Sequence, residues 1–234
     1  MKNIIIKSLC STAVVLALAS SAYAVPSNGV RFSTDGTTWT PALIVTDGGA
    51  GDLDATANGS ISTFHAVDIG SFHLVVTTSF TFPAVGTLAS PMMDLHVGGT
   101  TTGAGTLYVE FSSTGFQPVP TGAVLTTIAP NQPGVTETEI TRIGATDAMF
   151  APAGATFATL GPISIGNATS SGIVPPGVSP YTITIQDKFI SSGSGLTLST
   201  DTRLSVPDGG NTLMLLGSAL SVLGLGVFRK SRKA

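Results

Sequence analysis

Between residues 25 and 205, apolar and polar residues alternate in short runs that turn-forming residues separate. Glycine, proline, Asn-Gly and Asp-Gly supply these breaks, and no run keeps apolar residues at helical spacing for more than about two turns. Period-two alternation places successive side chains on opposite faces of a strand. The pattern predicts strands over residues 30–33, 42–46, 60–65, 71–78, 92–97, 106–112, 123–128, 135–143, 155–160, 181–188 and 196–204.

Short strands at this spacing favour an all-β domain, an antiparallel β-sandwich with jelly-roll-like connections. The alternation also predicts which side chains face its core. The expected inward residues are Phe72, Leu74, Val76, Leu107, Val109, Phe111, Tyr181, Ile183 and Ile185. The expected outward residues are His73, Thr77, Tyr108, Glu110, Thr182, Thr184 and Gln186. In the range 135–143, Glu137 and Glu139 share one face, which predicts an edge strand whose charges discourage pairing with other chains.

The N-terminal segment is basic, then apolar, and ends in small residues. Two lysines precede the apolar run of residues 1–24, and Ala22 and Ala24 form a small-x-small cleavage site. This order is typical of a secretory signal peptide, so we expect a signal helix that is removed and a mature chain that begins at Val25. The apolar run is short for a permanent membrane anchor, which needs about 20 residues.

The C-terminal segment combines an apolar stretch with a basic end. Residues 213–228 carry no charge, and residues 229–233 contain two arginines and two lysines. The stretch would make about 24 Å of helix, which also suits a buried core helix. The basic cluster favours a transmembrane helix, because lysine and arginine stay on the cytoplasmic side. We expect a transmembrane helix over 213–228, a cytoplasmic tail over 229–234, and the domain 25–205 outside the cytoplasm.

A short motif precedes this helix within the linker 206–212. It consists of Val206, Pro207, Asp208, Gly209 and Gly210. The proline bars helix through the preceding residue and the glycines keep the chain open, which suits either a processing site or a simple hinge.

The motif, the apolar helix and the basic tail together resemble the PEP-CTERM class of exosortase sorting signals in its VPDSG variant, in which a serine usually stands at the position of Gly209. The resemblance implies recognition by an exosortase-like membrane enzyme, cleavage near the motif, and delivery to a bacterial surface. Proteins of this class are associated with exopolysaccharide and biofilm matrix. Residues 52–61, 91–95, 103–107 and 111–116 resemble, more loosely, an extracellular domain that recurs in the same class.

Charge is scarce and unevenly placed. Charged residues make up 10% of the chain, against about 25% in an ordinary soluble domain. Six of the ten lysines and arginines lie at the two ends, so residues 25–205 hold four basic and twelve acidic side chains. Such a surface disfavours nucleic acid as a partner. The only cysteine, Cys10, lies in the signal peptide, so the mature chain has no thiol for a disulfide, a metal or a nucleophile.

The best candidate for a cofactor site is the glycine-rich loop that contains Asp47, Asp52 and Asp54. Three carboxylates among flexible backbone carbonyls suit a hard cation such as calcium, although the spacing is not that of an EF-hand. The alternative is an acidic loop between two strands. We therefore expect no cofactor other than calcium, and calcium only if these side chains converge.

Two aromatic residues are candidates for stacking against a sugar ring, Trp39 and Tyr108. Residues 32–39 predict a hairpin with Asp35 and Gly36 at its turn, which would place Trp39 just after the turn. A single tryptophan more often caps a core, so both interpretations stay open.

The sequence contains no motif of a nucleophile elbow, a zinc protease, a phosphate loop or a dinucleotide fold, so we predict no catalytic residue and no enzyme. The histidines at 65, 73 and 96 fall on different predicted strands. Asp68, Asp94, Glu110 and Asp147 could form a glycosidase pair only if the fold brings two of them together.

The sequence therefore predicts a secreted, exosortase-sorted structural protein of the cell surface or extracellular matrix, associated with exopolysaccharide. The alternative is a carbohydrate-binding module, and a glycan-acting hydrolase is a weaker third possibility.

Overall fold

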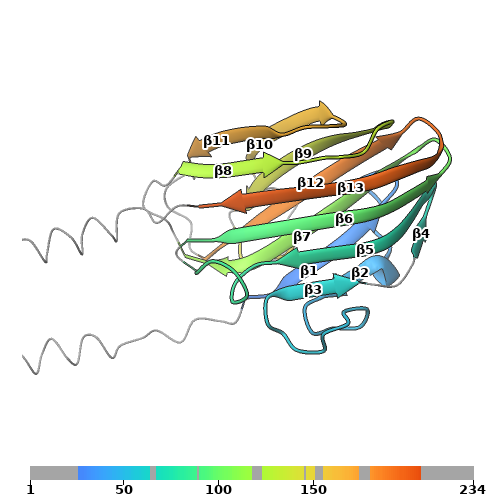
Figure 1. Cartoon of the computed structure of the whole chain (residues 1–234). Coiled ribbons are helices and arrows are strands. Elements are labelled where there is room, and N and C mark those ends of the chain that lie inside the picture. The colour runs from blue at the N-terminus through green and yellow to red at the C-terminus, as the bar shows by residue number, and fades with distance from the viewer. Residues whose placement is uncertain are drawn as a thin grey trace, which may run out of the picture.

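The computed structural model describes residues 26–63, 67–88, 90–117, 123–144, 146–150, 155–173 and 180–206. These residues form two antiparallel β-sheets that pack face to face (Figure 1). The all-β, antiparallel sandwich predicted from the sequence is thereby confirmed. In the described ranges, no helix has the length and apolarity needed to cross a membrane. The predicted signal helix, transmembrane helix and basic tail lie outside them.

The first sheet has six strands in the order β10-β9-β12-β7-β1-β2. Their bounds are β1 Asn28–Ser33, β2 Ile44–Thr46, β7 Gly105–Phe116, β9 Val135–Gly144, β10 Ala155–Ile163 and β12 Tyr181–Ser191. A short 3-10 helix, η1 (Pro41–Leu43), precedes β2. This sheet carries the candidate site on its outer face.

The second sheet has seven strands in the order β11-β8-β13-β6-β5-β3, and β4 pairs with β5 beside this path. Their bounds are β3 Ser60–Thr63, β4 Val67–Ile69, β5 Phe72–Phe80, β6 Met92–Thr102, β8 Ala123–Ile128, β11 Ala168–Ile173 and β13 Ser194–Ser205.

Each predicted range overlaps one of these strands, and β4 and β11 were not predicted. β4 has only three residues, and β11 reads Ala-Thr-Ser-Ser-Gly-Ile, which gives almost no apolar signal. Several strands continue past their predicted ends, because glycine and threonine residues there still pair in the ladder, as Gly98 and Gly99 of β6 do with β5 and β13.

The apolar core lies between the two sheets. Leu107, Val109 and Phe111 of β7 and Ile183 and Ile185 of β12 are fully buried there, as predicted. Their neighbours in the sequence point to the outer face of the six-stranded sheet. Thr182, Thr184 and Gln186, which were expected to be exposed, are buried as well. That expectation was wrong because residues 146–150 and polar side chains of adjacent strands cover this part of the outer face.

A β-bulge in β5 reverses the predicted alternation. The register with β6 shifts between Leu74 and Val76, so Val75 is 50% exposed. Beyond the bulge Thr77 is buried and Val76 is only half-buried, which contradicts the predicted inward Val76 and outward Thr77. One inserted residue turns every later side chain to the other face.

The prediction that β9 is an exposed edge strand is also wrong. β9 lies between β10 and β12, and its Glu137 and Glu139 are fully buried between the sheets. Asp187 of β12 is buried beside them. We call Glu137, Glu139 and Asp187 the buried acidic cluster. They face hydroxyl groups of the second sheet rather than water, among them Thr200 and Thr202 of β13.

Candidate functional site

An open pocket of about 520 Å³ lies on the outer face of the six-stranded sheet. Its lining comes from four adjacent strands, β1, β7, β12 and β9, and from the loops 34–40 and 146–150. The lining residues are Arg31, Gly36, Thr37, Trp39, Glu110, Arg142, Phe150, Thr184 and Gln186. We call this the outer-face pocket.

Strand register brings the polar residues of the pocket together. Arg31 of β1 lies directly opposite Glu110 of β7, which lies opposite Gln186 of β12. Thr184 of β12 is likewise opposite Arg142 of β9. Directly opposed side chains on one face of a sheet are about 5 Å apart at Cβ, so this row forms a continuous polar surface.

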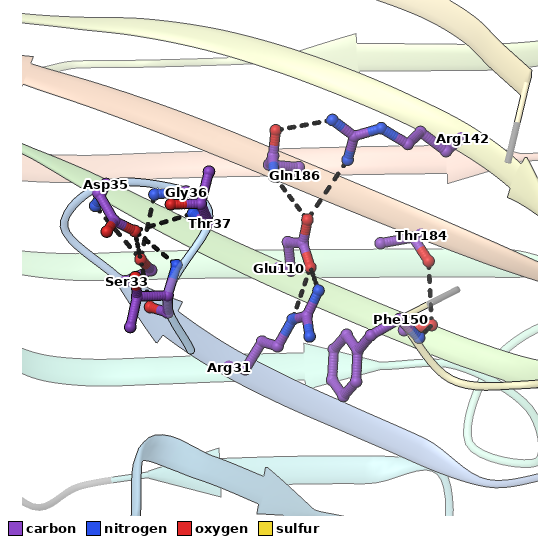
Figure 2. Close-up of polar contacts among 12 residues, drawn as sticks. Arg31, Ser33, Asp35, Gly36, Thr37, Glu110, Arg142, Phe150, Thr184 and Gln186 are labelled. Atoms are coloured by element: carbon purple, nitrogen blue, oxygen red, sulfur yellow. Dashed lines mark hydrogen bonds and ion pairs between the residues drawn. The ribbon is translucent and has the colours of Figure 1, made fainter. Parts of the chain in front are cut away.

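Glu110 is the centre of a charged network, although only 4% of its surface is exposed. Its Oε2 accepts a hydrogen bond from Nε of Arg31 at 2.7 Å and lies 2.5 Å from Nη2 of the same guanidinium. Its Oε1 accepts from Nη1 of Arg142 at 3.3 Å and from Nε2 of Gln186 at 2.5 Å. Gln186 in turn accepts from Nη2 of Arg142 at 3.0 Å. Figure 2 shows how these side chains converge on one carboxylate.

Two aromatic rings hold the guanidinium of Arg31. Its Cζ lies 3.9 Å from the ring centroid of Trp39 and 4.3 Å from that of Phe150. Cation–π contacts at these distances are attractive and fix the plane of the guanidinium. The pocket therefore has a rigid wall that is both aromatic and positively charged.

The loop that carries Trp39 is organised by Asp35. Its Oδ1 accepts the backbone N–H groups of Thr37 at 2.8 Å and Thr38 at 2.7 Å and the hydroxyl of Ser33 at 2.9 Å (Figure 2). These bonds, that from Thr38 first, hold the pKa of Asp35 well below its usual range. The connection is wider than the predicted hairpin, since β2 begins only at Ile44.

Glycine lets this loop lie flat on the sheet. Gly36 has a φ of 72°, in the left-handed region that favours glycine. A Cβ atom there would come within 2.9 Å of the Tyr108 ring. The loop can therefore reach over Tyr108 and place Trp39 beside Arg31.

Phe150 is held in the pocket against its own backbone preference. Its φ is 56°, which is uncommon for a bulky residue and costs about 1–3 kcal/mol. Its N–H donates to the hydroxyl of Ser112 at 3.0 Å, and Ser112 lies 3.0 Å from the hydroxyl of Thr184. The ring lies over Gly29 of β1, where a Cβ would be 3.0 Å from its Cζ. Strained residues of this kind cluster at functional sites.

The structure separates the two predicted stacking residues. Trp39 lines the pocket and is half-buried. Tyr108 is half-buried on the same face of the sheet but lies beneath Gly36 and does not line the pocket. The ammonium group of Lys188 is 5.6 Å from its ring centroid.

The carboxylates of the predicted calcium loop bind backbone rather than converging on one point. Asp47 accepts the N–H groups of Asn58 at 3.1 Å and Gly59 at 2.7 Å. Asp52 accepts those of Gly48 at 2.9 Å and Ser62 at 3.0 Å, and Asp54 that of Thr56. In the part of the chain that the structure describes, no group of three His, Cys, Asp or Glu residues could hold a metal ion. The structure thus uses Asp47, Asp52 and Asp54 as anchors of the loop.

The other candidate titratable groups do not meet in the pocket. His73 lies 2.6 Å from Asp68, and His96 lies 2.9 Å from Asp201, on the second sheet. Asp147 accepts the N–H of Gly115 at 2.5 Å. Of the four carboxylates considered for a glycosidase pair, only Glu110 lines the outer-face pocket. His65 lies outside the described residues.

The first residue of the predicted sorting motif belongs to the folded domain. Val206 is fully buried in the core. Its N–H donates to the carbonyl of Pro91 at 2.8 Å, and its carbonyl accepts from the hydroxyl of Ser90 at 2.6 Å. Pro207, Asp208, Gly209, Gly210 and the cleavage residues Ala22 and Ala24 lie outside the described residues.

Trp39 was predicted from the sequence as a candidate binding residue, but the other residues of the pocket were not predicted to lie beside it. The alternation correctly placed Glu110 and Gln186 on the outward face of their strands, and the same rule applied to β1 would have placed Arg31 there. In β9 it would have placed Arg142 on the inward face, because Glu137 and Glu139, on the opposite face of that strand, were expected to face water. What it could not supply is the order β9-β12-β7-β1, which makes these residues neighbours. Nothing in the sequence pattern pointed to Phe150.

No protein family's sequence profile matches the chain, and no curated protein does. Among solved structures, the chain is similar to the enzymatically active domain of tailspike protein 4 of bacteriophage CBA120, with 17% identity and a TM-score of 0.33 over 68% of this chain and 21% of that one. The chain thus spans about a fifth of that protein.

Two carbohydrate-binding modules are also similar to the chain. TmCBM61, solved in complex with β-1,4-galactotriose, has 9% identity and a TM-score of 0.25 over 62% of this chain and 81% of its own. TmCBM27, described for specific mannan recognition, has 9% identity and a TM-score of 0.26 over 63% of this chain and 95% of its own. These TM-scores are low, so the likenesses say nothing about what this chain binds.

Proposed function

We propose that this chain is a surface-displayed glycan-binding protein and that the outer-face pocket is its binding site. The observation that carries the proposal is the pairing, in one open pocket, of two aromatic rings with a fixed network of polar side chains. Pockets that combine a large apolar surface with a few well-placed polar groups are the usual sites for small ligands.

Sugars need this combination because each ring has an apolar face and a rim of hydroxyl groups. Trp39 offers an aromatic surface beside Arg31, and Thr37 and Thr184 offer hydroxyls that donate and accept hydrogen bonds. Glu110, Gln186 and the arginines fix one another, so the donors are in place before a ligand arrives. Preorganisation of this kind reduces the entropy lost on binding.

The route to the surface is part of the proposal and rests on the sequence. The N-terminal segment is typical of a signal peptide, and the C-terminal 29 residues resemble an exosortase sorting signal. In this proposal a jelly-roll-like sandwich is exported, held at the membrane by residues 213–228, and processed by an exosortase-like enzyme within Pro207 to Thr212. Its partner would then be exopolysaccharide of the surrounding matrix, and it would have no catalytic role.

Affinity electrophoresis of the full chain, in mild detergent, through gels that contain soluble polysaccharides tests the binding. We expect retardation in at least one polysaccharide gel, and we expect Trp39→Ala to weaken it about tenfold because one stacked ring surface is lost. Phe80→Ala is the matched control, since Phe80 is a half-buried aromatic of β5 in the other sheet. The proposal would be contradicted if both variants lost the same share of the retardation, or if no polysaccharide slowed the migration of the chain.

A further inference from the structure

The basic residues of the domain are concentrated on one face. Residues 25–205 contain four of them, Arg31, Arg142, Lys188 and Arg203, against twelve acidic residues. Arg31 and Arg142 line the outer-face pocket, and Lys188 lies two residues beyond Gln186 on the same face of β12. Only Arg203 lies in the other sheet, where it is opposite Asp94. An acidic domain thus presents three of its four cations beside one pocket.

The lining of the pocket contains fewer acidic than basic groups. Among the described residues that line it, Glu110 is the one carboxylate, and it is shared by two guanidinium groups. The side chains of Asp35 and Asp147 are exposed to solvent and are not among the residues that line the pocket. Within the described residues, the lining of the pocket therefore carries two positive charges and one negative charge.

The pocket also has more free hydrogen-bond donors than free acceptors. Both oxygens of Glu110 and the side-chain oxygen of Gln186 already accept bonds within the network. Each guanidinium has five N–H donors and spends two of them there. The side chains of Arg31 and Arg142 are 17% and 24% exposed, so part of each remains open to a ligand. The pocket offers donors and one surplus positive charge.

A ligand that fits must accept hydrogen bonds and carry a negative charge. Each hydroxyl of a neutral sugar has an O–H donor that needs an acceptor, and the network has few acceptors left for them. A carboxylate on a sugar ring accepts two parallel N–H bonds from one guanidinium, which is the geometry that arginine favours.

We infer that the outer-face pocket selects uronic acid residues, so that the ligand is an acidic polysaccharide rather than a neutral one. The inference rests on the proposed function and specifies its ligand. Arg142 provides the bidentate contact to the sugar carboxylate, because Arg31 is enclosed between two aromatic rings and the sheet. Trp39 receives the face of the sugar ring beside it.

Matched polymers test the choice of ligand. The full chain is run against polygalacturonate, alginate and hyaluronate, and against the methyl esters of the same polymers, which keep the ring hydroxyls but lose the charge. We expect at least tenfold tighter binding to one of the free acids than to its ester, and we expect sodium chloride to weaken only the binding to the free acid.

Two variants distinguish an effect of the pocket from an effect of the protein's overall charge. Arg142→Gln should lower affinity for the free acid about tenfold and lower affinity for the ester by a smaller factor, so that the preference for the free acid falls. Arg203→Gln removes the same charge from the other sheet and should change neither. Equal loss in the two variants would overturn the inference.

The outcomes also distinguish this inference from the proposed function. Equal binding to acids, esters and neutral dextran, galactan or mannan would overturn the selection of uronic acids and leave glycan binding intact. Binding of poly-L-glutamate as tight as that of the best polysaccharide would show a response to charge alone and would also overturn it. Binding to none of the polymers would overturn both proposals.

Discussion

Carboxyl groups lie on both faces of the six-stranded sheet, and the two faces stabilise them in different ways. On the outer face, Glu110 is surrounded by Arg31, Arg142 and Gln186. On the inner face, the buried acidic cluster of Glu137, Glu139 and Asp187 has no ion pair among the described residues. Burial of a carboxylate requires either a counter-charge or a proton. On the outer face, arginines supply the counter-charge. On the inner face, the geometry favours carboxyl groups that keep their proton.

Hydroxyl groups are the main partners of the buried acidic cluster. Thr200 donates to Glu137 at 2.6 Å, Thr202 donates to Asp187 at 2.9 Å, and Thr141 donates to Glu139. One oxygen of Glu139 and one of Asp187 have no partner within the described residues. Burial raises the pKa of Glu137 and of Glu139 to about 7, and burial together with the neighbouring glutamates raises the pKa of Asp187 well above its usual range.

The comparison predicts a large loss of stability as the pH rises. The folded domain binds more protons than the unfolded chain between pH 4.5 and about 7, so its free energy of unfolding falls through this window. Each glutamate contributes about 3 kcal/mol to that fall. We expect the free energy of unfolding to be on the order of 5 kcal/mol lower at pH 8 than at pH 5, measured by urea denaturation. A stability that is flat or rises over this range would contradict protonated glutamates in the core.

Removing the negative charge of the outer face should lower stability by a smaller amount, and this effect is measured at a single pH. Glu110→Gln leaves Arg31 and Arg142 facing each other without a counter-charge, so we expect about 2 kcal/mol lower stability at pH 7. Asp68→Asn is the matched control, because the side chain of Asp68 is 78% exposed, and it should change stability by less than about 0.5 kcal/mol. A neutral effect of Glu110→Gln would mean that the network does not hold the arginines in place.

The same substitution on the inner face should act in the opposite direction. Glu139→Gln replaces a carboxyl that must lose its proton above pH 7 with an amide that has no charge to bury. We expect about 1 kcal/mol higher stability than the unmodified chain at pH 8, and no gain at pH 5. Thermal unfolding at both pH values measures this. A loss at pH 8 as large as that of Glu110→Gln would erase the distinction between the two faces.

The alternation of residues predicted the strands and most of the core, because burial on one face of a strand follows from period two alone. It failed where the chain inserts an extra residue, as at Val75, since a bulge reverses the alternation without an apolar signal. It also failed for Glu137 and Glu139, because the sequence pattern of a glutamate that faces threonine hydroxyls is the same as that of a glutamate that faces water. The pocket depends on which strands lie side by side, and this is set by contacts far apart in the sequence.

The burial of Val206 has a mechanical consequence. The last residues of β13 pair with β6 on one side and β8 on the other, and Val206, which follows them, is buried in the core. A pull applied beyond Val206 runs along β13 and loads many ladder bonds in shear at once, because these bonds lie across the strand direction. In the proposed function, a polymer held in the outer-face pocket would pull on the other sheet. Tension between a captured polymer and an anchored tail would therefore cross the whole apolar core instead of peeling one strand from an edge.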